Sequence, residues 1–153
     1  MVRLRDMSHV RIDRVEFPSA GGTVRGLYYS MEGVDTCVVL CHGYSSSKHN
    51  VDPLAFHLAA DGYATLAFDF LGHKLGASTG PLREGADLVA NALDACAVAR
   101  RMEGVEHLVI GGRDCDDRIN AAHEQRVVDV RIVAVGHWRM GEGLPSVVDA
   151  GMF

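Results

Sequence analysis

The sequence lacks several features that would each place a protein in a well-defined class. No apolar run comes near the roughly 20 residues that a membrane-spanning helix needs, and residues 1–14 contain no signal-peptide core. With 48% hydrophobic residues, 23% charged residues and a net charge of −5, the composition excludes a disordered chain and argues against general nucleic-acid binding. We therefore expect a cytoplasmic protein that binds neither membranes nor nucleic acid.

Cysteine is sparse, and its spacing does not suit metal or redox chemistry. The four cysteines form no Cys-x-x-Cys pair, so the sequence indicates neither a zinc site nor a thioredoxin-type motif. Cys37, Cys41 and Cys96 lie in apolar segments and are expected to be small buried side chains. There is also no internal repeat, linker or low-complexity segment, so residues 1–153 are expected to form a single domain.

The sequence does contain an alternation of apolar strands and helices from residue 36 onward. Strands are predicted at 11–17, 23–31, 36–41, 64–70, 108–110 and 130–135. Helices are predicted at 53–61, 84–102, 117–125 and 145–150. This alternation predicts a three-layer α/β fold around a mostly parallel, doubly wound sheet of about six strands.

Local signals set the expected limits of these elements. Asp52 is expected to cap the helix over 53–61. The pair Gly111-Gly112 is expected to end the strand over 108–110. Within 84–102 one face of the helix is apolar and is expected to pack on the sheet. That face consists of Leu88, Ala92, Ala95, Ala99 and Met102.

Two loops at the expected carboxyl ends of the strands carry the most informative residues, because ligands of open α/β sheets bind at that edge. The first loop reads HGYSSSKH over residues 42–49, and the second reads DFLGHKLGAS over 69–78. They resemble two loops of the α/β-hydrolase superfamily, in its small serine-hydrolase branch. That family has an oxyanion loop of the form His-Gly-x-x-Ser-Ser and a later Asp-x-Arg-Gly-His-Gly-x-Ser; here Leu71 replaces the arginine, and Lys74-Leu75 is inserted.

The resemblance covers residues 10–138, which would be the first six strands of that fold. It implies that His42, Gly43 and Tyr44 form the oxyanion loop, with the Tyr44 backbone N–H as one oxyanion donor and His42 orienting the loop. Ser45 and Trp138 would line the substrate pocket, although a packing role is an equal alternative for Trp138. No metal and no cofactor are expected.

The segment that should carry the nucleophile departs from the family pattern. The family has Gly-x-Ser-x-Gly in a tight strand–turn–helix elbow, whereas residues 112–116 read GRDCD and contain no serine. Asp114 at the nucleophile position would be a carboxylate nucleophile, as in dehalogenases and epoxide hydrolases of the superfamily. Cys115, the residue that would supply the second oxyanion N–H, would alternatively be a thiolate nucleophile. The third interpretation is that the elbow no longer holds a nucleophile.

The resemblance further implies that the catalytic acid and base follow a seventh and an eighth strand, which we do not expect within these 153 residues. The expected function is therefore that of a hydrolase-family protein for small ester-like substrates, with little or no activity because the triad is incomplete. The alternative is a non-catalytic scaffold that serves as a binding or structural domain. The expected partner is a second copy of the chain, which would form a homo-oligomer through an uncovered sheet edge after residue 135.

Overall fold

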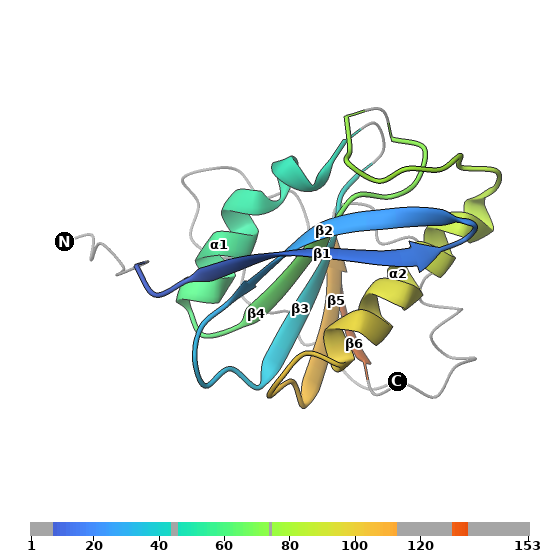
Figure 1. Cartoon of the computed structure of the whole chain (residues 1–153). Helices are drawn as coiled ribbons and strands as arrows, with labels where there is room; N and C mark the ends of the chain where they lie inside the picture. The colour runs from blue at the N-terminus through green and yellow to red at the C-terminus, as the bar shows by residue number, and fades with distance from the viewer. Residues whose placement is uncertain (1–7, 44–45, 74, 113–129, 135–153) are drawn as a thin grey trace.

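In the computed structural model (Figure 1), the described residues form one mixed six-stranded sheet with helices on both faces. The structure describes residues 8–43, 46–73, 75–112 and 130–134, the last segment as backbone only. The strands are β1 (Arg11–Ser19), β2 (Gly22–Ser30), β3 (Thr36–Cys41), β4 (Ala64–Phe68), β5 (His107–Gly112) and β6 (Val130–Ala134). The helices are the short η1 (Lys48–Asn50), α1 (Asp52–Ala60) and α2 (Gly85–Arg100). The predicted α/β fold with about six strands is confirmed.

The strand order is β1-β2-β4-β3-β5-β6, and the last four strands in this order are parallel. β1 and β2 form an antiparallel hairpin, and β2 pairs antiparallel with β4. The hairpin turn is Ala20-Gly21, where both residues have positive φ (48° and 78°), the conformation that matches the twist of paired strands. β4, β3, β5 and β6 then pair in parallel, so their carboxyl ends lie at one edge of the sheet.

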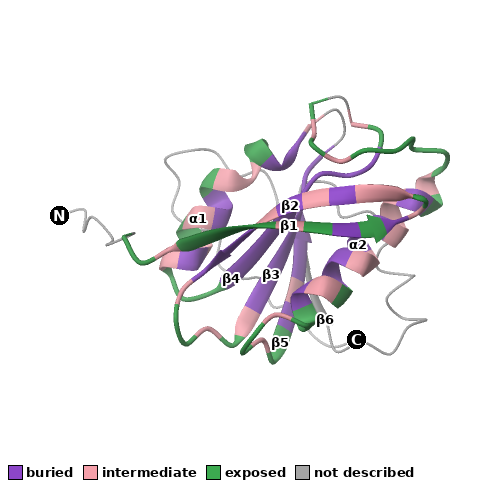
Figure 2. Cartoon of the chain, in the orientation of Figure 1, coloured by how far each residue is buried: buried purple, intermediate pink, exposed green. Residues whose placement is uncertain are grey.

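Alternate side chains of the central strands supply two separate apolar clusters, one on each face of the sheet. On one face Val38 and Leu40 pack with Leu54, Ala55 and Ala59 of α1. On the other face the sheet packs against the predicted apolar face of α2, where Ala92, Ala95 and Ala99 are fully buried. Figure 2 shows the central strands β3 and β4 buried almost throughout. Successive strand residues point to opposite faces, which is why a continuous apolar run becomes a strand covered by a helix on each side.

The described cysteines are small buried side chains, as the sequence predicts. Cys37, Cys41 and Cys96 are all buried, and Cys37 and Cys96 lie in the cluster under α2. Burial, with a smaller contribution from neighbouring Cys96, raises the pKa of the Cys37 thiol to about 12. Cys37 is therefore a protonated, unreactive thiol at neutral pH.

Two predicted boundaries are wrong, each because a tertiary contact overrides a local signal. Asp52 does not cap α1: Val51 occupies the N-cap, and the Asp52 carboxylate instead accepts hydrogen bonds from the Tyr29 hydroxyl (2.8 Å) and pairs with His49 (3.0 Å). Gly111 and Gly112 continue β5, where they pair with Leu40 and Cys41 of β3. A Cβ on Gly112 would collide with the Cys41 carbonyl oxygen, so the glycine permits close strand pairing there.

Candidate functional site

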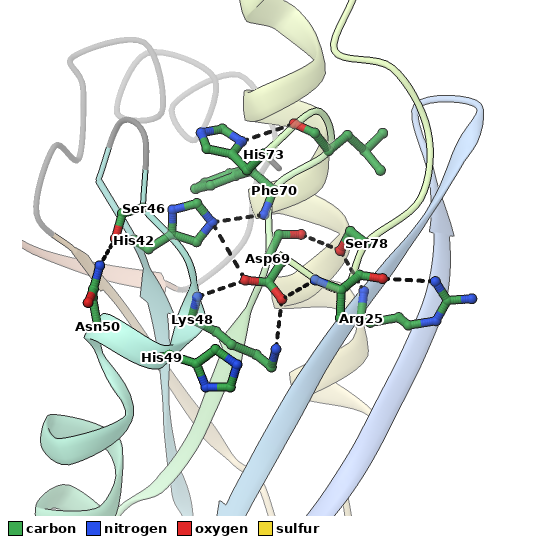
Figure 3. Close-up of polar contacts among 12 residues, drawn as sticks. Arg25, His42, Ser46, Lys48, His49, Asn50, Asp69, Phe70, His73 and Ser78 are labelled. Carbon is green, nitrogen blue, oxygen red and sulfur yellow. Dashed lines mark hydrogen bonds and ion pairs between the residues drawn. The ribbon is translucent and has the colours of Figure 1, made fainter. Parts of the chain in front are cut away.

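The carboxyl ends of β3 and β4 bring together two loops that are distant in the sequence. His42 and Gly43 directly follow β3, and Asp69 directly follows β4, which ends at Phe68. Because β3 and β4 are parallel neighbours, residues 42–43 and 46–50 lie beside residues 69–73 and 75–78 (Figure 3). This is the edge at which open α/β sheets bind ligands.

A buried ion pair joins the two loops. The Lys48 ammonium donates to Oδ2 of Asp69 at 2.8 Å, and the Lys48 backbone N–H donates to Oδ1 at 2.7 Å. The Asp69 side chain has no exposed surface, and that of Lys48 is 9% exposed. Two bonds to one carboxylate from the same residue hold the start of η1 against the end of β4 (Figure 3).

The loop after β4 folds back over the same carboxylate. The Ala77 N–H donates to Oδ2 of Asp69 at 2.8 Å, and the Ser78 hydroxyl donates to the Asp69 carbonyl at 2.6 Å. Ser78 Oγ also accepts from the backbone N–H of Arg25 on β2 at 2.8 Å. A Cβ on Gly76 would lie 2.8 Å from Cβ of Asp69, so the loop can pass this close to the aspartate only with glycine there.

These bonds determine the charge of Asp69. Burial by itself would raise the pKa of the Asp69 carboxyl, but hydrogen bonds from Ala77 and from both donors of Lys48 outweigh it and lower that pKa. Asp69 is therefore a carboxylate at neutral pH, and Lys48 balances its charge. A buried charge without such a partner would be strongly destabilising.

His42 is held in the same network as a neutral imidazole. Its Nδ1 lies 2.9 Å from the Gly43 carbonyl, and its Nε2 lies 3.1 Å from the Phe70 backbone N–H. A carbonyl only accepts and an N–H only donates, so Nδ1 carries the proton and Nε2 accepts. Burial, partly offset by the Gly43 carbonyl, lowers the pKa of His42. Both ring nitrogens are occupied, so His42 fixes the two loops and has no free lone pair for proton transfer.

Helix α2 contacts the loop after β4 through Asn91. Its side-chain oxygen accepts from the Leu71 N–H at 3.1 Å, and its amide nitrogen donates to the Ser19 hydroxyl at 2.8 Å. Asn91 is fully buried, and both of its polar atoms are satisfied. The loop after β4 is thus bonded to β2, to η1 and to α2.

Comparison with solved structures identifies the fold. An esterase from Pyrococcus furiosus superposes with a TM-score of 0.67 at 22% identity, over 82% of this chain and 48% of that one. The α/β hydrolase GrgF from Penicillium sp. gives 0.68 at 20% identity, over 81% and 45%. The chain has the N-terminal part of an α/β-hydrolase fold.

An epoxide hydrolase from an endophytic Streptomyces shares the same hydrolase fold, with a TM-score of 0.60 at 22% identity over 80% of this chain and 36% of that one. The chain thus spans less than half the length of each of these three hydrolases. No protein-family model and no curated protein matches the sequence. At identities of 20–22%, the similarity to these structures establishes the fold alone.

Within this hydrolase fold, the predicted site residues divide into two groups. His42 and Gly43 lie at the end of β3, next to the loop after β4. Tyr44, Ser45, Asp114, Cys115 and Trp138 lie outside the described residues. In the described part of the chain, no group of three or more His, Cys, Asp and Glu side chains is placed to hold a metal ion, and no helix there is long and apolar enough to cross a membrane.

Sequence reasoning did not assign roles to Lys48, Asp69 or Asn91, although they organise this edge of the hydrolase fold. Asp69 had a usable signal, since it directly follows a strand buried on both faces, and a buried carboxylate needs a charged or hydrogen-bonding partner. Lys48 and Asn91 had none, because lysine and asparagine are ordinarily exposed. Their partners are 21 and 20 residues away in the sequence.

Proposed function

We propose that this hydrolase-fold protein binds small ester-like molecules at the carboxyl edge of its sheet and hydrolyses them slowly. The observation that carries the proposal is the buried Lys48–Asp69 pair, which fastens the loop after β3 to the loop after β4. Ester hydrolysis requires hydrogen-bond donors that are already aimed at the oxyanion as it forms, and loops held in this way supply fixed backbone donors.

The described ends of the loop after β3 are held independently of that pair. The Ser46 N–H donates to the Gly43 carbonyl at 3.2 Å, and the Asn50 N–H donates to the Ser47 carbonyl at 3.1 Å. The side chains of Asn50 and Ser46 are also hydrogen-bonded to one another. A loop with this many internal bonds supports an oxyanion-binding role, with the Tyr44 N–H as the proposed donor.

The rate is proposed to be low because the elbow segment GRDCD contains no serine. Asp114 or Cys115 would stand in for the family's nucleophile there. A nucleophile without a positioned base is weak, whereas oxyanion donors and substrate binding alone still give about 10³- to 10⁴-fold catalysis over water in a hydrolase that has lost its triad. We expect ester hydrolysis about 10³- to 10⁴-fold faster than in water alone.

The test is the initial rate of p-nitrophenyl acetate hydrolysis by the wild type, Asp114→Ala and Cys115→Ala, with Asp116→Ala as the matched control in the same segment. The expected result is a wild-type rate above buffer that falls in Asp114→Ala or Cys115→Ala and is kept in Asp116→Ala. A wild-type rate equal to that of buffer would refute ester hydrolysis.

A non-catalytic binding or structural domain is the second candidate, and the missing elbow serine favours it. Among the described strands β6 ends the sheet and pairs with β5 alone, which supports the proposal of a homo-oligomer formed through that edge. Light scattering coupled to size-exclusion chromatography tests this directly. A monomer at every concentration would contradict the edge-paired oligomer.

A further inference from the structure

The first strand lies at the opposite end of the described sheet from β6, and its first half is exposed. In that sheet β1 pairs with β2 on one side, so its other side forms an edge (Figure 1). Arg11, Ile12, Asp13 and Arg14 are all exposed, and Ile12 keeps 48% of its surface in solvent. An exposed edge strand with an apolar side chain is a surface on which another strand can pair.

The hydrogen bonds of β2 show which backbone groups of β1 face outward. The Thr23 N–H donates to the Thr79 carbonyl at 2.8 Å, and the Thr79 N–H donates back to the Thr23 carbonyl at 2.9 Å. Pro18 lies opposite Thr23, so these two residues share no ladder bond and the backbone of Pro18 points away from β2. The register is continuous over the whole of β1, and this direction alternates along a strand. The backbone N–H and C=O of Ile12 and Arg14 therefore also point outward.

The charges along this edge are complementary to those of a second copy of the same strand. Two identical edges that pair with each other are antiparallel and related by a two-fold axis. With Ile12 opposite Ile12 of the second copy, each Arg11 lies opposite an Asp13 of the other copy. The two Ile12 residues would exchange backbone hydrogen bonds, and Arg11 and Asp13 would occupy the positions between such bonds, where cross-strand side chains lie closest.

Other registers are disfavoured by the same charges. Moving the two-fold axis by one residue in either direction places Asp13 against Asp13 or Arg11 against Arg11, and like charges directly opposite each other are destabilising. An axis at Val15 would set Arg14 against Glu16. That glutamate is already bonded to Arg25 of its own chain at 2.7 Å, however, and this register would leave Ile12 against a proline. The register centred on Ile12 is therefore favoured.

The charged side chains at this edge are already arranged for such a contact. Within one chain Nε of Arg11 donates to Oδ2 of Asp13 at 2.9 Å, and the two side chains are 76% and 49% exposed. Pairing would join two of these exposed pairs into a cluster of four charges with alternating sign. On the other face of the sheet the two Ile12 side chains would cover each other. We propose that two copies of this chain associate by antiparallel pairing of their β1 strands, centred on Ile12.

The contact is small, and its strength follows from that. Contacts that bury less than about 1,200 Å² are ordinarily weak, so we expect a Kd between about 1 μM and about 1 mM. The β1 edge and the β6 edge are the two ends of the described sheet. The β1 contact is therefore independent of the oligomer proposed at β6, and it does not depend on ester hydrolysis.

The experiment exchanges the charges of the edge and measures association by sedimentation velocity from about 1 μM to about 1 mM. Asp13→Arg makes both charges positive, and Arg11→Asp makes both negative. Each variant alone should associate at least about tenfold more weakly than the wild type, because two attractive pairs become repulsive. An equimolar mixture of the two variants should regain the wild-type affinity, since every arginine then faces an aspartate. Glu103→Arg, at an exposed position after α2, makes the same charge change as Asp13→Arg and should associate as the wild type does.

Hydrogen exchange of the wild type gives a second readout that does not depend on a variant folding. The Ile12 N–H points outward and would be bonded only in the dimer, so its exchange should slow as the protein concentration rises through the Kd. The Val24 N–H, in buried β2, should exchange at the same rate at every concentration.

Each possible result decides for or against the pairing. A wild-type monomer at every concentration overturns it. A dimer that both charge variants leave unchanged also overturns it, because the contact then lies elsewhere, as at β6. A mixture of the variants that fails to associate overturns the register centred on Ile12. Association lost in each variant and regained in the mixture, with slowed exchange at Ile12, establishes the β1 pairing.

Discussion

At the residue scale, one buried carboxylate explains why a lysine is found in the interior. Asp69 receives three hydrogen bonds, two of them from Lys48, and its charge is balanced by the same residue. A buried pair of this kind stabilises little relative to an apolar pair, but the loss of one partner leaves a charge without compensation. The pair therefore fastens together two loops that the parallel pairing of β3 and β4 brings side by side.

We predict that Lys48→Met lowers the free energy of unfolding by about 3–5 kcal/mol, because it leaves the Asp69 carboxylate buried beside two backbone donors only. Urea denaturation measures the change. The control is Arg11→Met, which removes an exposed pair with Asp13 (2.9 Å) and should cost at most about 1 kcal/mol. Equal losses in the two variants would contradict a charge-compensating role for Lys48.

At the scale of elements, the loop between β4 and α2 depends on close approaches that only glycine permits. Gly72 has φ +75°, and a Cβ there would lie 2.5 Å from Cβ of Leu82. Gly33, in the turn between β2 and β3, has nearly the same φ, +78°, with no atom within 4 Å of the added Cβ. The two glycines thus share the same backbone conformation and differ in the space around them.

We predict that Gly72→Ala destabilises the protein about 1–3 kcal/mol more than Gly33→Ala. Both substitutions incur the cost of a left-handed backbone, roughly 1–2 kcal/mol, but only Gly72→Ala also forces the added methyl group against Leu82. Thermal unfolding of the two variants gives the comparison. Equal losses would mean that the loop moves away from Leu82 without cost.

At the scale of the whole molecule, the buried titratable groups make stability depend on pH. His42 is neutral in the folded state with a lowered pKa, whereas a histidine in the unfolded chain titrates near about 6.5. Below that pH the unfolded state binds a proton that the folded state does not, so acidification favours unfolding. Asp69, with its lowered pKa, adds a second loss of stability below about pH 4.

We predict that the free energy of unfolding is constant above about pH 6.5 and falls below it by up to about 1.4 kcal/mol per pH unit through His42. Urea denaturation at about pH 7.5 and about pH 5.5 measures this difference. His42→Gln should flatten it, while His57→Gln, at an exposed position on α1, should keep it. A wild-type stability that is the same at both pH values would show that folding does not lower the pKa of His42.

The sequence by itself determined the elements of the described part of the chain and the class of fold, because those depend on patterns that neighbouring residues carry; the helices predicted at 117–125 and 145–150 lie outside the described residues. The continuous apolar run at 36–41 predicts a strand covered on both faces, and the spacing of Ala92, Ala95 and Ala99 predicts which face of α2 is buried; both are confirmed. The two loop motifs then indicated the α/β-hydrolase fold, which the solved structures show.

Only the tertiary structure decided what the polar residues do. Lys48 meets Asp69 because β3 and β4 pair in parallel, and no local pattern states that pairing. Asp52 bonds to Tyr29 on another strand instead of capping its helix. Nε2 of His42 accepts the Phe70 N–H because the loop after β4 folds back beside the end of β3. Hydrophobic periodicity is local, whereas the partners of buried polar groups come from strand order and loop closure, which the whole chain sets.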